Sequence, residues 1–298
     1  MKPWDAKGKA LMLVSHVTRL SYSESVVEAH SEVRKSPVDT GLQRVITHKL
    51  EVSPGAKVQE YRDYFGTDVR YFNLLEPHDS VEIRANSIVE TTDAICCGPA
   101  YDLDGRPWTE KLVEYLQWSA SVPRLPDYAS VPNRVEPGLR GEAFIEALSE
   151  LGGTFRSMFR YDREATDVHS SPEELFQKGG GVCQDLTHAM LGVLRLASVP
   201  CRYVSGYLFD PASGGEEFKG SAPMTPVRGA SASHAWVQAW HSELGWIGID
   251  PTNDKLVDWQ YIRVAVGRDY ADVQPVRGVF LGAARQVLRV EVKVKRIG

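Results

Sequence analysis

The sequence predicts an α+β protein in which an N-terminal antiparallel β-sandwich precedes a domain with a helix packed on an antiparallel sheet. Short segments with strand character, separated by turn residues, fill residues 15–90. Farther along, three consecutive glycines open an apolar segment with helical spacing, and two segments that alternate at period two follow it. The length of 298 residues suffices for two hydrophobic cores of ordinary size.

The first domain is expected to consist of strands joined by tight turns. Ser53-Pro54-Gly55 and Gly66-Thr67-Asp68 are two of the turn sequences that separate them. The expected strands are 15–22, 26–34, 44–52, 58–64, 69–75 and 80–90. Residues 286–296, at the other end of the chain, alternate apolar and charged side chains, so they predict a strand with one solvated face that could return to the N-terminal sheet.

Residues 101–140 are interpreted as a helical and proline-rich connector between the sandwich (1–100) and the second domain (141–265), with the C-terminal strands in 266–298. The expected helices are 109–119, 142–151 and a short helix that Ser171 caps and Pro172 begins. Residues 155–161 are expected to form either a further helical turn or an extended segment. The long polar segment 210–228 is either a lid over the site or a tolerated surface insertion.

The glycine run leads directly into a cysteine. After Gly179-Gly180-Gly181, the apolar residues that follow Cys183 have helical spacing, so the helix is expected to begin at or just before Cys183. A thiol in the first turn lies at the positive end of the peptide dipoles, which favours the thiolate. The free amide groups of the same turn are suited to a developing oxyanion. Val199-Pro200 is expected to end the helix.

An imidazole and a carboxylate follow on a predicted hairpin. Residues 231–240 and 245–250 alternate as half-buried strands do, and the polar segment 241–245 lies between them. In an antiparallel hairpin, the residue numbers of each directly opposed pair have the same sum. We expect the register in which this sum is 484, because it places His234 directly across from Asp250, close enough for a hydrogen bond. A one-residue slip would send the two side chains to opposite faces.

The motifs around these three residues resemble those of the bacterial transglutaminase-like superfamily. They are Gly181-Val182-Cys183-Gln184-Asp185, Ser233-His234-Ala235-Trp236-Val237 and Trp246-Ile247-Gly248-Ile249-Asp250-Pro251. Upstream, Tyr61-Arg62-Asp63-Tyr64-Phe65-Gly66 resembles the N-terminal β-domain of such proteins. The resemblance implies a papain-like core with a catalytic triad of Cys183, His234 and Asp250. Taken singly, each of these residues also has a structural explanation, and only their joint arrangement points to catalysis.

Four further residues are weaker candidates for the oxyanion or substrate site. Gln177 lies just before the glycines, Tyr161 lies upstream, Gln184 follows the cysteine, and Trp236 belongs to an aromatic group that could line a cleft. Exposure at a helix end explains Gln177 better than a role in the site does, and core packing explains Trp236 equally well.

Composition narrows the classes of partner. The formal charge of -5 gives no reason to expect nucleic acid or an anionic membrane surface. Cys96, Cys97, Cys183 and Cys201 do not form a disulfide framework in a chain of this length, and no apolar run is long enough to span a bilayer. Cytoplasmic location is therefore the expectation. The oligomeric state stays open.

A metal site is not expected. Cys183 and His188 are five residues apart, about 140° around a helix, so they cannot easily share an ion. Asp102-Leu103-Asp104-Gly105 is a fragment of a calcium loop that is better interpreted as a turn. No cofactor is implied.

The expected activity is acyl transfer from a peptide or protein substrate through a thioester. Bacterial relatives of this architecture are mostly regarded as proposed cysteine proteases, so the resemblance favours hydrolysis of a peptide or isopeptide amide. Transfer of the acyl group to an amine, as in a transglutaminase, uses the same triad and stays an alternative. A non-catalytic binding module on the same fold is the third possibility.

Overall fold

The computed structural model describes residues 9–92, 112–165, 170–211, 228 and 233–298. The fold is α+β, with antiparallel sheets and few helices, which confirms the predicted class. Cys96, Cys97, the 102–105 turn, the start of the 109–119 segment and most of the 210–228 segment lie outside the described residues. No described helix is long and apolar enough to cross a membrane.

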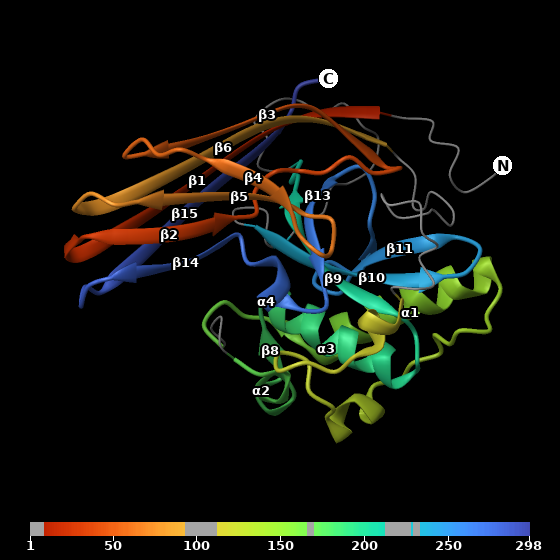
Figure 1. Ribbon diagram of the computed structural model, residues 1–298. Coiled ribbons are helices and arrows are strands. Elements are labelled where there is room, and N and C mark those ends of the chain that lie inside the picture. The colour runs from red at the N-terminus through yellow and green to blue at the C-terminus, as the bar shows by residue number, and fades with distance from the viewer. Residues whose placement is uncertain (1–8, 93–111, 166–169, 212–227, 229–232) are drawn as a thin grey trace.

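Two four-stranded antiparallel sheets form the sandwich (Figure 1). The first sheet has the order β15-β1-β6-β3, with bounds Gln286–Arg296, Lys9–Val26, His78–Thr92 and Gln43–Ser53. The second has the order β14-β2-β5-β4, with bounds Val276–Leu281, Glu28–Val33, Asp68–Leu74 and Gln59–Arg62. The two C-terminal strands, β14 and β15, are therefore edge strands of the two N-terminal sheets, and β15 pairs with β1 along eleven residues.

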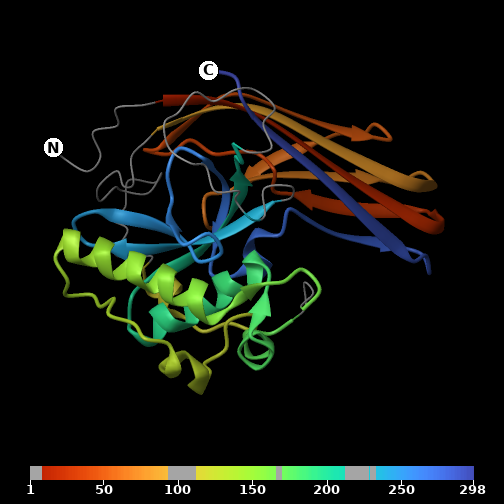
Figure 2. The same ribbon diagram turned by 180° about the vertical axis from the view of Figure 1, so that it is seen from behind.

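The second domain is built on a five-stranded sheet of order β12-β11-β10-β9-β13. The bounds are Lys255–Leu256, Gly245–Asp250, His234–His241, Cys201–Leu208 and Tyr261–Gly267. Helices α1 (Gly141–Met158) and α3 (Cys183–Leu196) lie against one face of it, on the side away from the sandwich (Figure 2). Because the sheet is covered in this way, the three central strands are buried almost throughout, with Trp240 as the one half-buried residue.

Smaller elements complete the second domain. They are the 3-10 helices η2 (Leu112–Leu116) and η3 (Pro126–Ser130), the helices α2 (Pro172–Lys178) and α4 (Tyr270–Val273), and the paired strands β7 (Arg160–Tyr161) and β8 (Gly180–Gly181). Helix α2 begins after Ser171 with Pro172 at its first position, as the sequence predicted.

Two helix predictions are wrong in extent. The helix expected to end at Leu151 continues to Met158, because Phe144, Leu148, Leu151 and Phe155 form one buried stripe. Gly152 lies in this stripe where a Cβ atom would come within 3.0 Å of Ile249, so the glycine allows close packing. The helix expected at 109–119 is, in its described part, only the 3-10 turn η2. Tyr115 is its single buried residue, so no apolar face supports a longer helix.

The sandwich and the second domain share one hydrophobic core. Met12 and Val14 of β1 belong to the same buried cluster as Val264 of β13 and the residues of α3. Hydrogen bonds also join the two domains. The Gln43 side-chain amide donates to the Arg263 carbonyl oxygen at 2.8 Å and accepts from the Arg263 N–H at 2.8 Å. Since the two domains share a core and ordered hydrogen bonds, they are expected to move as one body.

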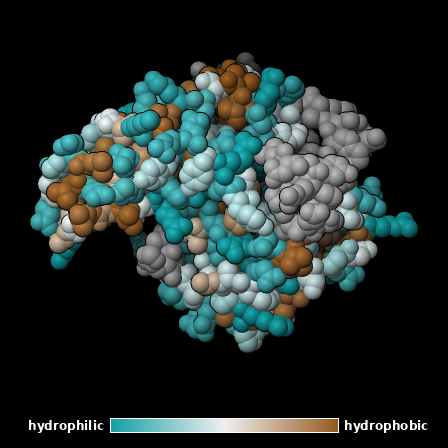
Figure 3. All heavy atoms as spheres, viewed as in Figure 1, coloured by the Kyte–Doolittle hydropathy of each residue, from teal (hydrophilic) through white to brown (hydrophobic). Residues whose placement is uncertain are grey.

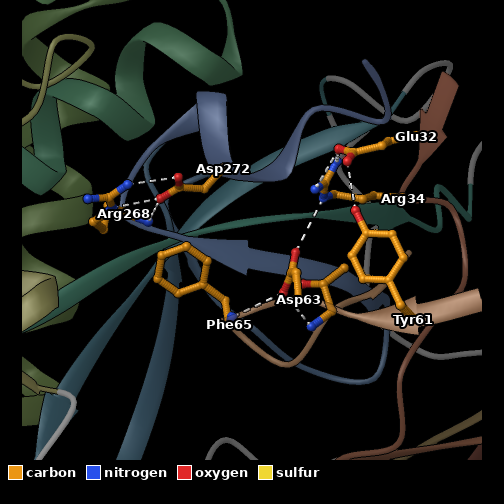
Figure 4. A network of polar contacts seen from close by, with 8 residues as sticks. Glu32, Arg34, Tyr61, Asp63, Phe65, Arg268 and Asp272 are labelled. Carbon is orange, nitrogen blue, oxygen red and sulfur yellow. Dashed lines mark hydrogen bonds and ion pairs between the residues drawn. The ribbon is translucent and has the colours of Figure 1, made fainter. Parts of the chain in front are cut away.

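The 61–66 motif makes a second contact across the interface (Figure 4). Asp63 accepts hydrogen bonds from the Phe65 N–H at 3.0 Å and from Arg34 Nε at 3.3 Å. This turn presents the Phe65 ring to the second domain, where the guanidinium carbon of Arg268 lies 5.7 Å from its centroid. Phe65 also packs on the buried cluster that contains Trp236. Phe65 of this motif therefore packs against the face of the five-stranded sheet that α1 and α3 do not cover.

Candidate active site

Cys183 is the first residue of α3, as the glycine run predicted. Gly179 adopts the left-handed conformation at φ +66° and ends α2. Gly181 has no room for a side chain, since a Cβ atom there would lie 2.7 Å from Asp185 Oδ2. That oxygen accepts a hydrogen bond from the Val182 N–H at 2.8 Å, which fixes the start of the helix. The thiol is half-buried at this helix end.

The other described cysteine differs in every respect that matters for reactivity. Cys201 is fully buried on β9, and its Sγ lies 3.5 Å from the carbonyl oxygen of Leu191, to which it donates. Burial raises the pKa of the Cys201 thiol to about 11. Cys201 is therefore a packing residue, and it provides an internal reference for the behaviour of Cys183.

A buried imidazole and a buried carboxylate face each other on the sheet. His234 begins β10 and Asp250 ends β11, and His234 Nε2 lies 2.7 Å from Asp250 Oδ2. Neither side chain has any solvent exposure. A carboxylate at this distance fixes the tautomer of the ring and stabilises its protonated form.

The predicted hairpin register is wrong by two residues. The paired numbers sum to 486, with His241 opposite Gly245 and Val237 opposite Ile249 as the last pair before the strands diverge. The loop closes this way because His241 Nδ1 accepts the N–H groups of Glu243 and Leu244, and Gly245 takes a positive φ of 75°. A two-residue shift keeps the parity of the strand, so the two side chains stay on one face as diagonal neighbours.

Asp250 also organises the turn that follows it. Its Oδ1 accepts the N–H groups of Thr252 and Asn253, at 2.8 and 3.3 Å. Its Oδ2 accepts from Asn253 Nδ2 at 2.7 Å and from the Tyr261 hydroxyl at 2.9 Å, in addition to His234. Burial raises the pKa of this carboxyl, but the charge of His234 and these donors outweigh burial and hold it below its usual value.

Tyr261 was missed by sequence reasoning. It lies on β13, eleven residues after Asp250, and nothing in its local sequence marks it as a partner of that carboxylate. Asn253 lies three residues after Asp250, and its bond to that carboxylate was likewise not anticipated. Both residues act on the carboxylate and through it on the imidazole.

The electrostatics of His234 connect it to Cys183. Burial alone would lower the pKa of the imidazole, but the charge and hydrogen bond of Asp250, together with a hydrogen bond and charge from Cys183, raise it from 6.5 to about 10. His234 Nδ1 is buried and has no hydrogen-bond partner of standard geometry within the described residues. Bonds of this kind are often long in proteins without substrate and shorten in the reacting complex.

The weaker candidates lie in different surroundings. Tyr161, on β7, pairs with Gly181 of β8 two residues before the cysteine. Gln184 is buried in the first turn of α3, and the Trp236 ring lies 6.3 Å from that of His234. Gln177 donates to Glu173 of its own helix at 3.4 Å, a contact that involves no other predicted site residue.

Tyr203 and Tyr270, which lie near the thiol, were also not predicted from the sequence. Burial raises the pKa of Tyr203 and of Tyr270, and the charge of Cys183 raises both further. Tyr270 comes from α4, whose first N–H donates to His188 Nε2 on α3 at 3.1 Å. Within the described ranges, no group of three or more His, Cys, Asp or Glu side chains is arranged to hold a metal ion.

Comparison with known proteins places the chain in a family. Residues 12–90 match the bacterial transglutaminase-like N-terminal region, and residues 135–251 match the transglutaminase-like superfamily core. An uncharacterized protein of Mycobacterium leprae is 34% identical over 96% of this chain and 99% of its own length. The crystal structure of a proposed cysteine protease from Cytophaga hutchinsonii covers 98% of this chain and 93% of its own with a TM-score of 0.66 at 19% identity, which supports the fold.

A shorter match concerns an enzyme with a stated activity. The protein-glutamine gamma-glutamyltransferase of Pseudomonas aeruginosa is 36% identical over 88 residues, which are 30% of this chain and 12% of that protein. With both domains matched and a relative aligned over almost its full length, the chain belongs to the transglutaminase-like superfamily and carries the bacterial transglutaminase-like N-terminal region.

Proposed function

We propose that this protein is a cysteine-dependent hydrolase that cleaves a peptide or isopeptide amide bond through a thioester intermediate. Cys183 is the nucleophile, His234 the general base and acid, and Asp250 the residue that orients His234. The observation that carries the proposal is the fully buried 2.7 Å pair of His234 and Asp250, coupled to a half-buried thiol at a helix start.

The reaction follows from the protonation states that the site favours. With the His234 pKa raised to about 10, a proton resides on the imidazole at neutral pH, where it stabilises a Cys183 thiolate. The thiolate attacks the amide carbonyl carbon, a C–S bond forms, and the first-turn amides of α3 receive the oxyanion. His234 then gives its proton to the nitrogen as the C–N bond breaks, and the amine leaves.

Water completes the cycle. His234, now neutral, takes a proton from water, and the hydroxide attacks the thioester carbonyl. The C–S bond breaks, the carboxylic acid is released, and the thiolate and imidazolium are restored. Through both half-reactions Asp250 stays ionised, because the charge of His234 and the hydrogen bonds from His234, Asn253 and Tyr261 hold its pKa low.

Acyl transfer to an amine is the second candidate. Its support is the match to the Pseudomonas aeruginosa glutamyltransferase, which spans 88 residues. The two reactions differ only in whether water or an amine resolves the thioester. A glutamine-containing peptide incubated with the protein and a fluorescent primary amine separates them: hydrolysis yields the acid and ammonia, and transfer yields the labelled peptide.

The third candidate is a non-catalytic binding module on the same fold, in which Cys183 is not an active nucleophile. Iodoacetamide labelling of the native protein, followed by peptide mapping, tests it in a Cys96→Ser/Cys97→Ser background. The hydrolase proposal predicts that Cys183 reacts at least a hundredfold faster than Cys201, whose thiol is buried with a pKa of about 11. Equal, slow labelling of both cysteines would support a binding module.

The proposal extends to compartment and partner. A nucleophilic free thiol is maintained in a reducing compartment, so we place the protein in the cytoplasm with a peptide or protein as its substrate. Fractionation of the source cells with antibodies to the chain checks the location.

A further inference from the structure

The two edge strands of the first sandwich sheet, β15 and β3, differ in regularity. Each is eleven residues long. The pairing of β3 with β6 has a register shift between Val45 and Thr47, an irregularity of the kind that protects an edge from pairing with another chain. β15 pairs with β1 through all eleven of its residues without a shift. Within the described residues no strand pairs with the other side of β15, so this strand is a regular edge that is open to a further strand.

The backbone groups of β15 that face the open side belong to its even-numbered residues. At the two ends of the β1–β15 pair, the Ser23 N–H donates to the Arg285 carbonyl oxygen at 2.9 Å, and the Ile297 N–H donates to the Leu11 carbonyl oxygen at 2.7 Å. In an antiparallel pair such bonds occur at every second residue, so the odd-numbered residues of β15 bond to β1. The N–H and C=O groups of Val290 and of the other even-numbered residues therefore point to the open edge, where a second strand can bond to them.

Apolar side chains are exposed at the same edge. The exposed fractions of Val287, Leu288 and Val290 on β15 are 54%, 55% and 43%. On β14, the edge strand of the second sheet that precedes β15 in the chain, Val279 and Leu281 are 70% and 60% exposed. Figure 3 shows apolar residues gathered at the end of the sandwich where β2 and β14 lie. Large apolar side chains exposed at both edges are typical of a surface that binds another protein.

Charges of both signs lie on the solvent face of β15. Glu291 pairs with Lys293 of its own strand at 2.6 Å. Arg289 lies directly opposite Arg19 of β1, whose own ion pair is with Glu82. The open edge therefore carries a cation and an anion two residues apart, at Arg289 and Glu291, and a second strand of the same sequence can match this spacing.

We propose that two copies of this chain pair through β15 about a two-fold axis at Val290, which joins their first sheets into one continuous antiparallel sheet. About this axis Val290 lies opposite Val290 of the second copy, Leu288 opposite Val292, and Arg289 opposite Glu291. Apolar side chains thus meet apolar side chains, and each Arg289 gains a carboxylate. Because both copies use the same surface, the contact is self-complementary and closes at a dimer.

Neighbouring registers match less well. With the axis at Arg289 or at Glu291, that charged residue lies opposite its own copy, which is destabilising. With the axis at Val292, Arg289 lies opposite Lys295, and with the axis at Leu288 it lies opposite a valine. Charge complementarity therefore selects the axis at Val290 among the registers that keep the middle of the strand paired. The pairing uses none of the candidate active-site residues, so it is tested independently of the proposed function.

Sedimentation velocity of the full chain measures the oligomeric state. A strand pair with these side chains is a small interface, below about 1,200 Å² in total, so the parent protein is expected to become dimeric within a range of about 1 to 100 μM. Arg289→Glu sets carboxylates opposite each other on both sides of the axis, and Glu291→Arg sets guanidinium groups opposite each other there. Each single variant alone is expected to raise the Kd of the dimer at least about tenfold.

An equimolar mixture of the two single variants separates the pairing from any effect on folding. In the mixed dimer every opposed charged pair is again of opposite sign, so the Kd is expected to return to within about threefold of the parent value. The double variant Arg289→Glu/Glu291→Arg is expected to dimerise in the same way. Lys49→Glu, which breaks the 2.7 Å pair with Glu51 on β3 at the other edge of the sheet, is the matched control and is expected to leave the Kd unchanged.

Three results would count against the pairing. A parent protein that stays monomeric throughout this range would overturn it, and so would single variants, folded by circular dichroism, that dimerise as the parent does. Single variants that are monomeric and do not recover in the mixture would refute the axis at Val290.

Discussion

Replacing Asp250 with asparagine tests the electrostatic basis of the site. The pKa of His234 is raised from 6.5 to about 10, a difference of about 3.5 units, which corresponds to about 5 kcal/mol of stabilisation of the protonated ring. Asp250 is the largest contributor among the groups that raise this pKa. Without its charge, burial is the dominant influence, and burial lowers the pKa of an imidazole. The His234 midpoint is therefore expected to drop below 6.5 in Asp250→Asn.

The same substitution has a predicted effect on stability. Because the folded-state pKa of His234 lies above the unfolded value, its stabilising contribution is complete below about pH 6.5 and is lost as pH rises toward 10. Asp250→Asn is therefore expected to reduce the free energy of unfolding by about 3 to 5 kcal/mol at pH 6, and by less at pH 9.5.

NMR titration of selectively labelled histidine measures the His234 midpoint, and urea unfolding at the two pH values measures the stability. Asp258→Asn is the matched control, since Asp258 pairs with Lys255 and is not among the groups that shift the pKa of His234. A parent protein whose His234 titrates near 6.5, or an asparagine variant with an unchanged midpoint, would refute the reasoning.

Three further predictions follow from single contacts. Tyr261→Phe removes one donor to the buried carboxylate and is expected to cost about 2 kcal/mol of stability; unchanged thermal unfolding would contradict this. Gly181→Ala forces a Cβ atom against Asp185 and is expected to slow alkylation of the thiol at the helix start, while Gly55→Ala, with nothing within 4 Å, serves as its control. Burial lowers the pKa of Lys35 to about 7, so the contribution of Lys35 to stability is expected to rise with pH from 7 to 10.5, opposite in sign to that of His234. In urea unfolding, the free energy of unfolding of Lys35→Met relative to the parent protein should therefore fall over that range.

The elements that sequence predicted well are those whose signal is local. Alternation at period two and turn residues gave the strands of the sandwich to within a few residues, except that β1 begins earlier, at Lys9. The glycine run located the start of α3 because Gly179 takes a positive φ and Gly181 has no room for a Cβ atom beside Asp185. Cys183 is thus placed by its immediate neighbours in the chain.

The hairpin register shows where local signals end. Alternation constrains only parity, so registers that differ by two residues satisfy the same pattern. The choice between them depended on His241, whose ring nitrogen accepts two backbone N–H groups and closes the loop. These two hydrogen bonds form only in the folded turn, so neither the residue types nor their spacing predicted them.

By itself, the sequence determined the α+β class, the order of the elements, the superfamily, and the three residue types that come to the site. Tertiary structure decided the rest: the five donors around Asp250, one of them a tyrosine from β13, and the placement of Arg163 and Arg228 over the Tyr161 ring. The physical reason is that periodicity and turn propensity act between neighbours in the chain. Burial, pKa and charge, in contrast, depend on which distant segments the fold brings together.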